Sequence, residues 1–120
     1  MSIIQQREKL LQWMAALNTL QSEINTLKTN LTFTLQQEVH PALLQSIESI
    51  QTQLLEQDMA IALIRHEMAI RMGAEEPAAE DGSFDEWEQK TGHDMERMNE
   101  ELLLLHAALE MVHNDYQEHE

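Results

Sequence analysis

Three side chains near the C-terminus have the types and the spacing of a metal site. His106, Glu110 and His113 stand at i, i+4 and i+7, so a helix would carry them on one side. Two imidazoles and a carboxylate can ligate Zn²⁺ or Fe²⁺. A di-iron bundle, however, uses a second Glu-x-x-His copy and further inward glutamates, and this sequence has no second copy. We predict no metal and no other cofactor, and a metal-binding helical protein that uses these three residues is kept as the second alternative function.

The sequence offers no pattern of covalent catalysis. It has no Cys, only three Gly and no Gly-x-Ser-x-Gly motif. Thiolate chemistry is thereby excluded, and neither a nucleophile elbow nor a glycine-rich phosphate loop is present. The sequence therefore predicts a protein that is not an enzyme.

The charge balance restricts the partners. The 120 residues include 22 Asp and Glu against 7 Lys and Arg, which gives a formal net charge of -15. Such a chain is repelled by phosphate backbones and by anionic membranes, so we expect no direct binding to nucleic acid or membrane. The sequence shows neither a signal-peptide pattern nor an apolar run of about 18 residues, and we expect a cytoplasmic protein.

The composition predicts few, long helices. Leu, Gln, Glu, Met and Ala are abundant, whereas the chain has three Gly, two Pro and only two Val. Straight-chain residues lose little side-chain freedom in a helix, and β-branched residues that favour strands are scarce. Because turn-forming residues are also rare, the chain has few places to reverse. The expected fold class is all-α, with three long helices in an antiparallel, coiled-coil-like bundle completed by dimerisation.

Heptad periodicity defines the first two helices, at about residues 3–38 and 41–72. The apolar positions of the first are Ile3, Leu10, Trp13, Leu17, Leu20, Ile24, Leu27 and Leu31, with Gln6 and Thr34 as polar interruptions. Those of the second are Leu43, Ile47, Ile50, Leu54, Ile61, Ile64 and Met68, with Gln57 as an interruption. The two patterns are out of phase by two residues, and the shift coincides with His40-Pro41, where we predict a break. Whether the helices form a hairpin or a kinked rod stays open.

The C-terminal part begins with an acidic linker over residues 73–83. Gly73 follows the last periodic residue and is expected to stop the second helix. Ser83 is a suitable N-terminal cap for a third helix over about residues 84–117, with a brief interruption expected at Lys90–His93. The apolar positions of this helix are Met95, Met98, Leu102, Leu105, Leu109, Val112 and Tyr116.

The middle helix carries a second apolar stripe. Leu55, Met59, Leu63 and Ile70 follow one another at spacings of four, four and seven residues. A helix that is apolar on two sides is buried on two sides, so we expect these residues to mediate self-association into a homodimer. The alternative is that the first and third helices cover both stripes within one chain.

Acidic charge is concentrated in the C-terminal part. Residues 1–72 contain five cations and seven anions, whereas residues 73–120 contain two cations and fifteen anions. A solvated surface that keeps the protein in solution is one interpretation. The other is a docking surface for a basic protein, in which carboxylates steer the partner and exposed aromatic rings anchor it. The candidate partner-binding residues are Phe84, Asp85, Glu86, Trp87 and Glu88, with Trp87 expected to be exposed.

The expected function is a non-enzymatic protein–protein interaction module. It is a small acidic adaptor, chaperone or inhibitor that self-associates through its N-terminal helices and binds a basic partner through its acidic part. The first alternative is a nucleic-acid mimic, of the kind that phages and mobile elements encode, which inhibits a DNA- or RNA-binding protein. Duplex DNA presents one charge per about 1.7 Å, and the interval from Leu102 to Leu109 has no carboxylate. That gap counts against the mimic.

Overall fold

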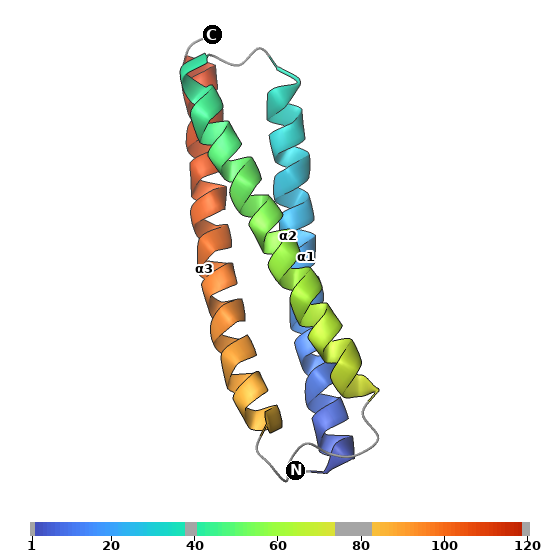
Figure 1. The fold of residues 1–120 in the computed structure, drawn as a ribbon. Coiled ribbons are helices and arrows are strands. Elements are labelled where there is room, and N and C mark those ends of the chain that lie inside the picture. The colour runs from blue at the N-terminus through green and yellow to red at the C-terminus, as the bar shows by residue number, and fades with distance from the viewer. Residues whose placement is uncertain (1, 38–40, 74–82, 119–120) are drawn as a thin grey trace.

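Three long helices pack side by side in an up-down-up bundle (Figure 1). The structure is a computed structural model that describes residues 2–37, 41–73 and 83–118. Its elements are α1 (Ile3–Leu35), a 3-10 turn η1 (Pro41–Leu43), α2 (Leu44–Met72) and α3 (Ser83–Glu118). The molecule measures 62 × 19 × 16 Å, and the described segments contain no strand. The predicted all-α class with three long helices is confirmed.

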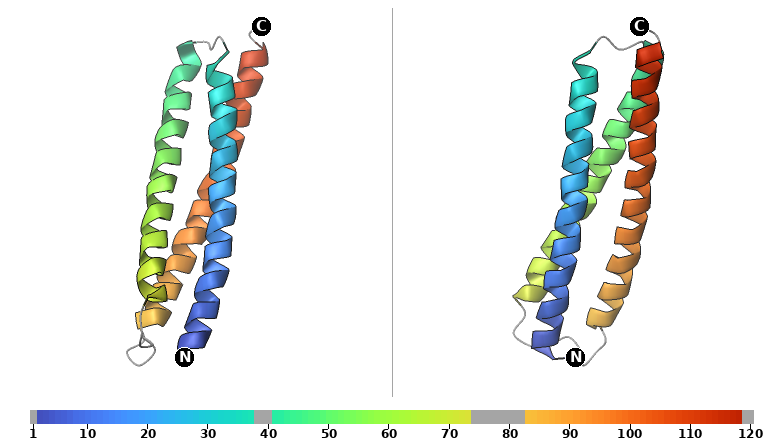
Figure 2. Two further views of the ribbon diagram at one scale, coloured as in Figure 1. Left: turned by 90° about the vertical axis from the view of Figure 1, so that its right-hand side faces the viewer. Right: turned by 180° about the vertical axis from the view of Figure 1, so that it is seen from behind.

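The first two helices form a hairpin and not a kinked rod. α1 runs from the N-terminus along the bundle and α2 returns beside it, as the two views in Figure 2 also show. Pro41 opens η1 immediately before α2, where its missing N–H costs no helical hydrogen bond. His40 and the preceding two residues lie outside the described residues, as does the predicted acidic linker between Gly73 and Ser83.

The helix ends follow local chemistry. At the start of α1, the backbone N–H of Gln5 donates to Oγ of Ser2 over 3.2 Å, and the backbone N–H of Ser2 donates to Oε1 of Gln5 over 3.1 Å. This reciprocal capping box satisfies two donors that the first helical turn leaves without partners. At the end of α2, Gly73 is the C-cap, and its N–H donates to the carbonyl of Ala69 over 3.1 Å.

The core is the heptad seam of the three helices. Trp13 and Leu43 are half-buried, and the side chains of Ile3 and Tyr116 are not described. The other apolar seam residues are all buried: Leu10, Leu17, Leu20, Ile24, Leu27, Leu31, Ile47, Ile50, Leu54, Ile61, Ile64, Met68, Met95, Met98, Leu102, Leu105, Leu109 and Val112. The polar interruptions Gln6, Thr34 and Gln57 are buried with them. A polar residue at a seam position restricts the register at which helices can pair.

The expected interruption of the third helix at Lys90–His93 is wrong. α3 is continuous through these residues, and Thr91 belongs to the core with 2% of its surface exposed. Gly92 faces α1, where a Cβ atom added to it would lie 3.3 Å from Cη2 of Trp13. Glycine weakens a helix interior by about 1 kcal/mol, and close packing against the neighbouring helix outweighs such a preference.

Polar contacts join α1 to α2. Nζ of Lys28 pairs with the carboxylate of Asp58 on α2, and Nη2 of Arg65 on α2 donates to Oδ1 of Asn18 over 2.7 Å. These contacts lie along one side of α1, at the boundary with α2. Each exposed ion pair contributes only about 0–1 kcal/mol, so the apolar seam is the main source of stability.

Candidate functional site

The two aromatic residues expected to anchor a partner are buried inside the bundle. Phe84 is 1% exposed and Trp87 is 7% exposed, so the expectation that Trp87 offers an exposed contact is wrong. Nε1 of Trp87 donates to Oε2 of Glu67 over 2.7 Å. The guanidinium carbon of Arg71 lies 5.1 Å from the centre of the Trp87 ring and 5.9 Å from that of Phe84. These rings join the end of α2 to the start of α3.

Their burial has a simple cause in the register of α3. Phe84 precedes Thr91 by seven residues, and Thr91 precedes Met98 by seven, so all three lie on the buried seam. The proximity of an acidic linker suggested exposure, but the phase of the helix determines which side chains face the core. The Phe84 and Trp87 rings, 5.8 Å apart, extend the core to the end of the bundle.

The three acidic members of the predicted partner site are divided between two environments. Asp85 and Glu86 are exposed in the first turn of α3, where negative charge is favourable because the helix dipole is positive there. Glu88 is half-buried and binds α1: it accepts from Nζ of Lys9 over 3.1 Å and from Nε1 of Trp13 over 3.4 Å. Of the five candidate residues, only Asp85 and Glu86 lie at the surface.

The second stripe of α2 is fully at the surface. Leu55, Met59, Leu63 and Ile70 are between 56% and 65% exposed. At about 100° per residue they fall within an arc of about 80°, on the side of α2 opposite its seam. We call these four residues the α2 outer stripe. The alternative that the other two helices cover both stripes within one chain is wrong, because α1 and α3 contact only the seam side.

A second exposed apolar surface was missed by the sequence analysis. Leu103, Leu104 and Met111 on α3 are 64%, 71% and 66% exposed, and we call them the α3 outer patch. Glu96 and Glu100, both exposed, precede it along the same helix. The signal that could have found the patch is the run of four leucines at 102–105, because a heptad seam uses only two of the four positions.

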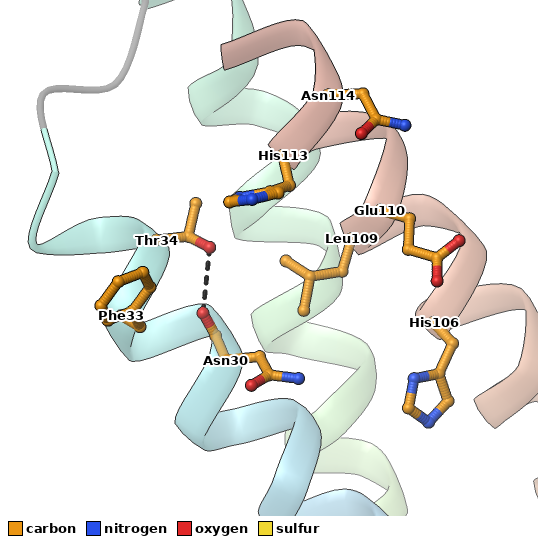
Figure 3. Close-up of a pocket in the computed structure, with 8 residues that line it drawn as sticks. All are labelled: Asn30, Phe33, Thr34, His106, Leu109, Glu110, His113 and Asn114. Atoms are coloured by element: carbon orange, nitrogen blue, oxygen red, sulfur yellow. Dashed lines mark hydrogen bonds between the residues drawn. The ribbon is translucent and has the colours of Figure 1, made fainter. Parts of the chain in front are cut away.

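The histidine triplet lines an open cavity between α1 and α3 but forms no metal cluster. The cavity has a volume of about 550 Å³. Figure 3 shows the ring of His113 pointing toward Thr34 on α1, while the carboxylate of Glu110 points away from α1. Within residues 2–37, 41–73 and 83–118, no group of three or more His, Asp or Glu side chains is arranged to hold a metal ion.

A second open cavity lies between the same two helices, nearer the N-terminus of α1. It has a volume of about 490 Å³ and is lined by Trp13, Ala16, Leu20, Gly92 and Met95, among others. Small side chains on both helices leave this space open. Both cavities lie between α1 and α3, and we call this side of the bundle the α1/α3 face. No residue of α2 is among those that line the two cavities. In the right panel of Figure 2, which shows the bundle from behind, α1 and α3 stand in front of α2.

Comparisons with known proteins add no relative: no family model, curated protein or solved structure matches this chain. None of the described helices combines the length and the apolar character needed to cross a membrane.

Proposed function

We propose that the protein is a non-enzymatic protein–protein interaction module that self-associates through the α2 outer stripe. The observation that carries this proposal is the exposure of four large apolar side chains along one side of α2. Soluble monomers rarely expose contiguous apolar patches larger than a few hundred Å², and such patches commonly mark interfaces. Full burial of each side chain is worth about 1.5–3 kcal/mol, which favours a second surface that covers the stripe.

The second part of the proposal is a basic partner bound by the outer face of α3. Asp85, Glu86, Glu96 and Glu100 are exposed along this helix. Carboxylates so placed raise the rate of encounter with a cationic protein, and apolar residues supply most of the binding energy after docking. Because Phe84 and Trp87 are buried, the anchors in this proposal are the residues of the α3 outer patch.

No observation favours the nucleic-acid mimic. A mimic needs dense negative charge over a long surface. On α3 the exposed residues Leu103, Leu104 and Met111 occupy the interval between Glu101 and Asp115, where Glu110 is the only acid. The run from Leu102 to Leu109, which has no acid, extends over about 12 Å of helix at 1.5 Å per residue. An apolar patch in that position supports a protein partner instead.

The test of self-association is sedimentation of the purified chain over a range of concentrations. The wild type should form species larger than the monomer, and Leu63→Arg should shift them to the monomer because a charge then interrupts the stripe. The matched control is Leu11→Arg, which places the same charge at an apolar position on α1 that is 55% exposed. Circular dichroism should show equal helix content in all three proteins. A wild type that remains monomeric up to about 1 mM, where even a weak complex would form, would contradict the proposal.

A further inference from the structure

The charged side chains of the second cavity on the α1/α3 face are all acidic. Glu23 of α1 and Glu96 of α3 line this cavity, and none of the described residues around it is a Lys, Arg or His. Neither carboxylate forms a hydrogen bond or an ion pair with another residue of the described segments. We call this space the Trp13 cavity, after the aromatic ring in its wall. Two carboxylates without a cation at one cavity favour a positively charged ligand.

The ring of Trp13 is held by contacts with α3. Its Nε1 donates to Oε2 of Glu88 over 3.4 Å, and Nζ of Lys9 pairs with the other oxygen of the same carboxylate over 3.1 Å. At Gly92 the absence of a side chain leaves room for the ring, because an added Cβ atom would lie 3.3 Å from Cη2. Since the indole nitrogen is engaged with Glu88, the ring offers carbon surface to the cavity. A ring that is already positioned loses little freedom when a ligand packs against it.

The rest of the wall suits a ligand with an apolar stem. Ala16, Leu20 and Met95 add carbon surface, and Thr19 and Asn99 add uncharged polar groups. The volume of about 490 Å³ is within the range of small-ligand sites, about 300–1,000 Å³. An arginine side chain combines a methylene stem with a planar guanidinium, which stacks on aromatic rings and donates to carboxylates. The ammonium of lysine is more strongly hydrated and has no planar face to stack.

We propose that the Trp13 cavity receives an arginine side chain of a basic protein partner. This inference rests on the proposed binding of a basic partner by the outer face of α3 and names one of its contacts. Glu96 belongs to both surfaces, because it is exposed on α3 and also lines the cavity. Leu103 of the α3 outer patch follows Glu96 by seven residues, which places it on the same side of the helix two turns later. A partner that inserts an arginine beside Glu96 can therefore cover Leu103 with the same surface.

The probe is a hexa-arginine peptide, titrated at about 0.15 M salt, where exposed charges more than about 8 Å apart are largely screened. Calorimetry gives its Kd, and the indole N–H signals in NMR spectra locate it. The signal of Trp13 should shift on titration, whereas that of Trp87, which is 7% exposed at the end of the bundle, is the internal reference. Hexalysine should bind about threefold more weakly, because the stacking contact is lost. Equal affinity for the two peptides would overturn the assignment of arginine.

Two variants alter the cavity itself. Ala16→Leu fills it without a change of charge, and its control is Ala15→Leu, at the adjacent exposed alanine that does not line the cavity. Glu23→Gln removes one carboxylate, and its control is Glu48→Gln at an exposed position of α2. Each cavity variant should raise the Kd of hexa-arginine about tenfold, the loss expected when a hydrogen bond between charged groups is not made. Each control should change the Kd by less than about twofold.

A third substitution separates this inference from the proposed function. Glu100→Gln removes a charge from the outer face of α3 at a position that does not line the cavity. If Ala16→Leu and Glu23→Gln bind hexa-arginine like the wild type, or the Trp13 signal does not shift, the cavity is not the site and the inference is overturned. The proposed binding by the outer face of α3 then still stands if Glu100→Gln weakens binding more than Glu48→Gln does. A wild type that binds neither peptide contradicts both.

Discussion

The guanidinium carbon of Arg71 lies 5.1 Å from the centre of the Trp87 ring, and the Glu67 carboxylate accepts the hydrogen bond of the indole N–H. A cation, an aromatic ring and an anion thus meet where α2 ends and α3 begins. Cation–π contacts of this kind contribute about 0.5–2 kcal/mol, and the indole ring adds its buried apolar area. Trp87 therefore stabilises the hairpin of α2 and α3 and is not available to a partner.

Trp87→Ala should lower the free energy of unfolding by about 3–5 kcal/mol, because it removes a large buried ring and leaves a cavity. Trp87→Phe keeps an aromatic ring but loses the hydrogen bond to Glu67. It should lower the free energy of unfolding by at most about 3 kcal/mol. Denaturation by urea measures both values. Leu104→Ala, at an exposed position of α3, is the control and should change stability by less than about 0.5 kcal/mol. Wild-type stability in Trp87→Ala would show that the ring does not hold the helices together.

Burial along the heptad seam was predictable because a helix buries one stripe whatever its neighbours are. Leu17 and Ile24 stand in an unbroken pattern, and both are buried. At Gly92 the same reasoning failed, because local preference disfavours a helix there, whereas the packing of α3 against α1 carries the helix through this position. Trp13 and Gly92 are 79 positions apart in the sequence, and the periodicity of a single segment cannot predict a contact between them.

The candidate surfaces were predictable only in part, for a related reason. The spacing of Leu55 and Met59 identifies a second apolar stripe, but whether it is covered depends on where the other helices lie. Phe84 was assigned to the surface from its acidic neighbours, although the seven-residue step to Thr91 places it in the core. The cavities between α1 and α3 depend on how these helices are arranged, and no single segment encodes them.

Gly92→Ala should raise stability, but by less than the roughly 1 kcal/mol that alanine gains over glycine in a helix. The added Cβ atom would lie 3.3 Å from Cη2 of Trp13, which is closer than an ordinary carbon contact. Trp13 is half-buried beside an open cavity, so the ring can move by a few tenths of an ångström. Thermal or chemical unfolding gives the change in free energy.

A double-mutant cycle separates the two contributions at Gly92. In a Trp13→Leu background the close carbon atom is gone, so Gly92→Ala should show the full gain of about 1 kcal/mol. Equal effects of Gly92→Ala in both backgrounds would mean that the Trp13 ring imposes no constraint at this position.

Gln57→Leu should raise the stability of the monomer by about 1–2 kcal/mol. Gln57 is buried at a seam position, and its Oε1 atom has no hydrogen-bond partner, which costs about 1–3 kcal/mol. Its Nε2 donates to Oε2 of Glu101 over 2.7 Å, but Glu101 is exposed and water can replace that donor. Gln57→Ala is the contrast, because it removes the same polar group but leaves a cavity and should be destabilising. If Gln57→Leu unfolds at a lower urea concentration than the wild type, the hydrogen bonds of the Gln57 amide contribute net stability.

Glu100→Lys should stabilise the fold while weakening the proposed attraction for basic partners. Glu96 and Glu100 stand one turn apart on the exposed face of α3, and like charges at this spacing are destabilising. A lysine at position 100 replaces that repulsion with a favourable Glu–Lys pair, so unfolding at low salt should require about 0.5–1 kcal/mol more. The gain should shrink in 1 M salt, where the screening length is about 3 Å.

Binding of an oligolysine peptide, used as a basic probe, should weaken in the same Glu100→Lys variant, because the outer face of α3 loses negative charge. The control is Glu48→Lys on α2, which makes the same change in net charge away from α3. If both variants reduce peptide binding equally, net charge alone attracts the probe and the α3 face is not a distinct docking surface.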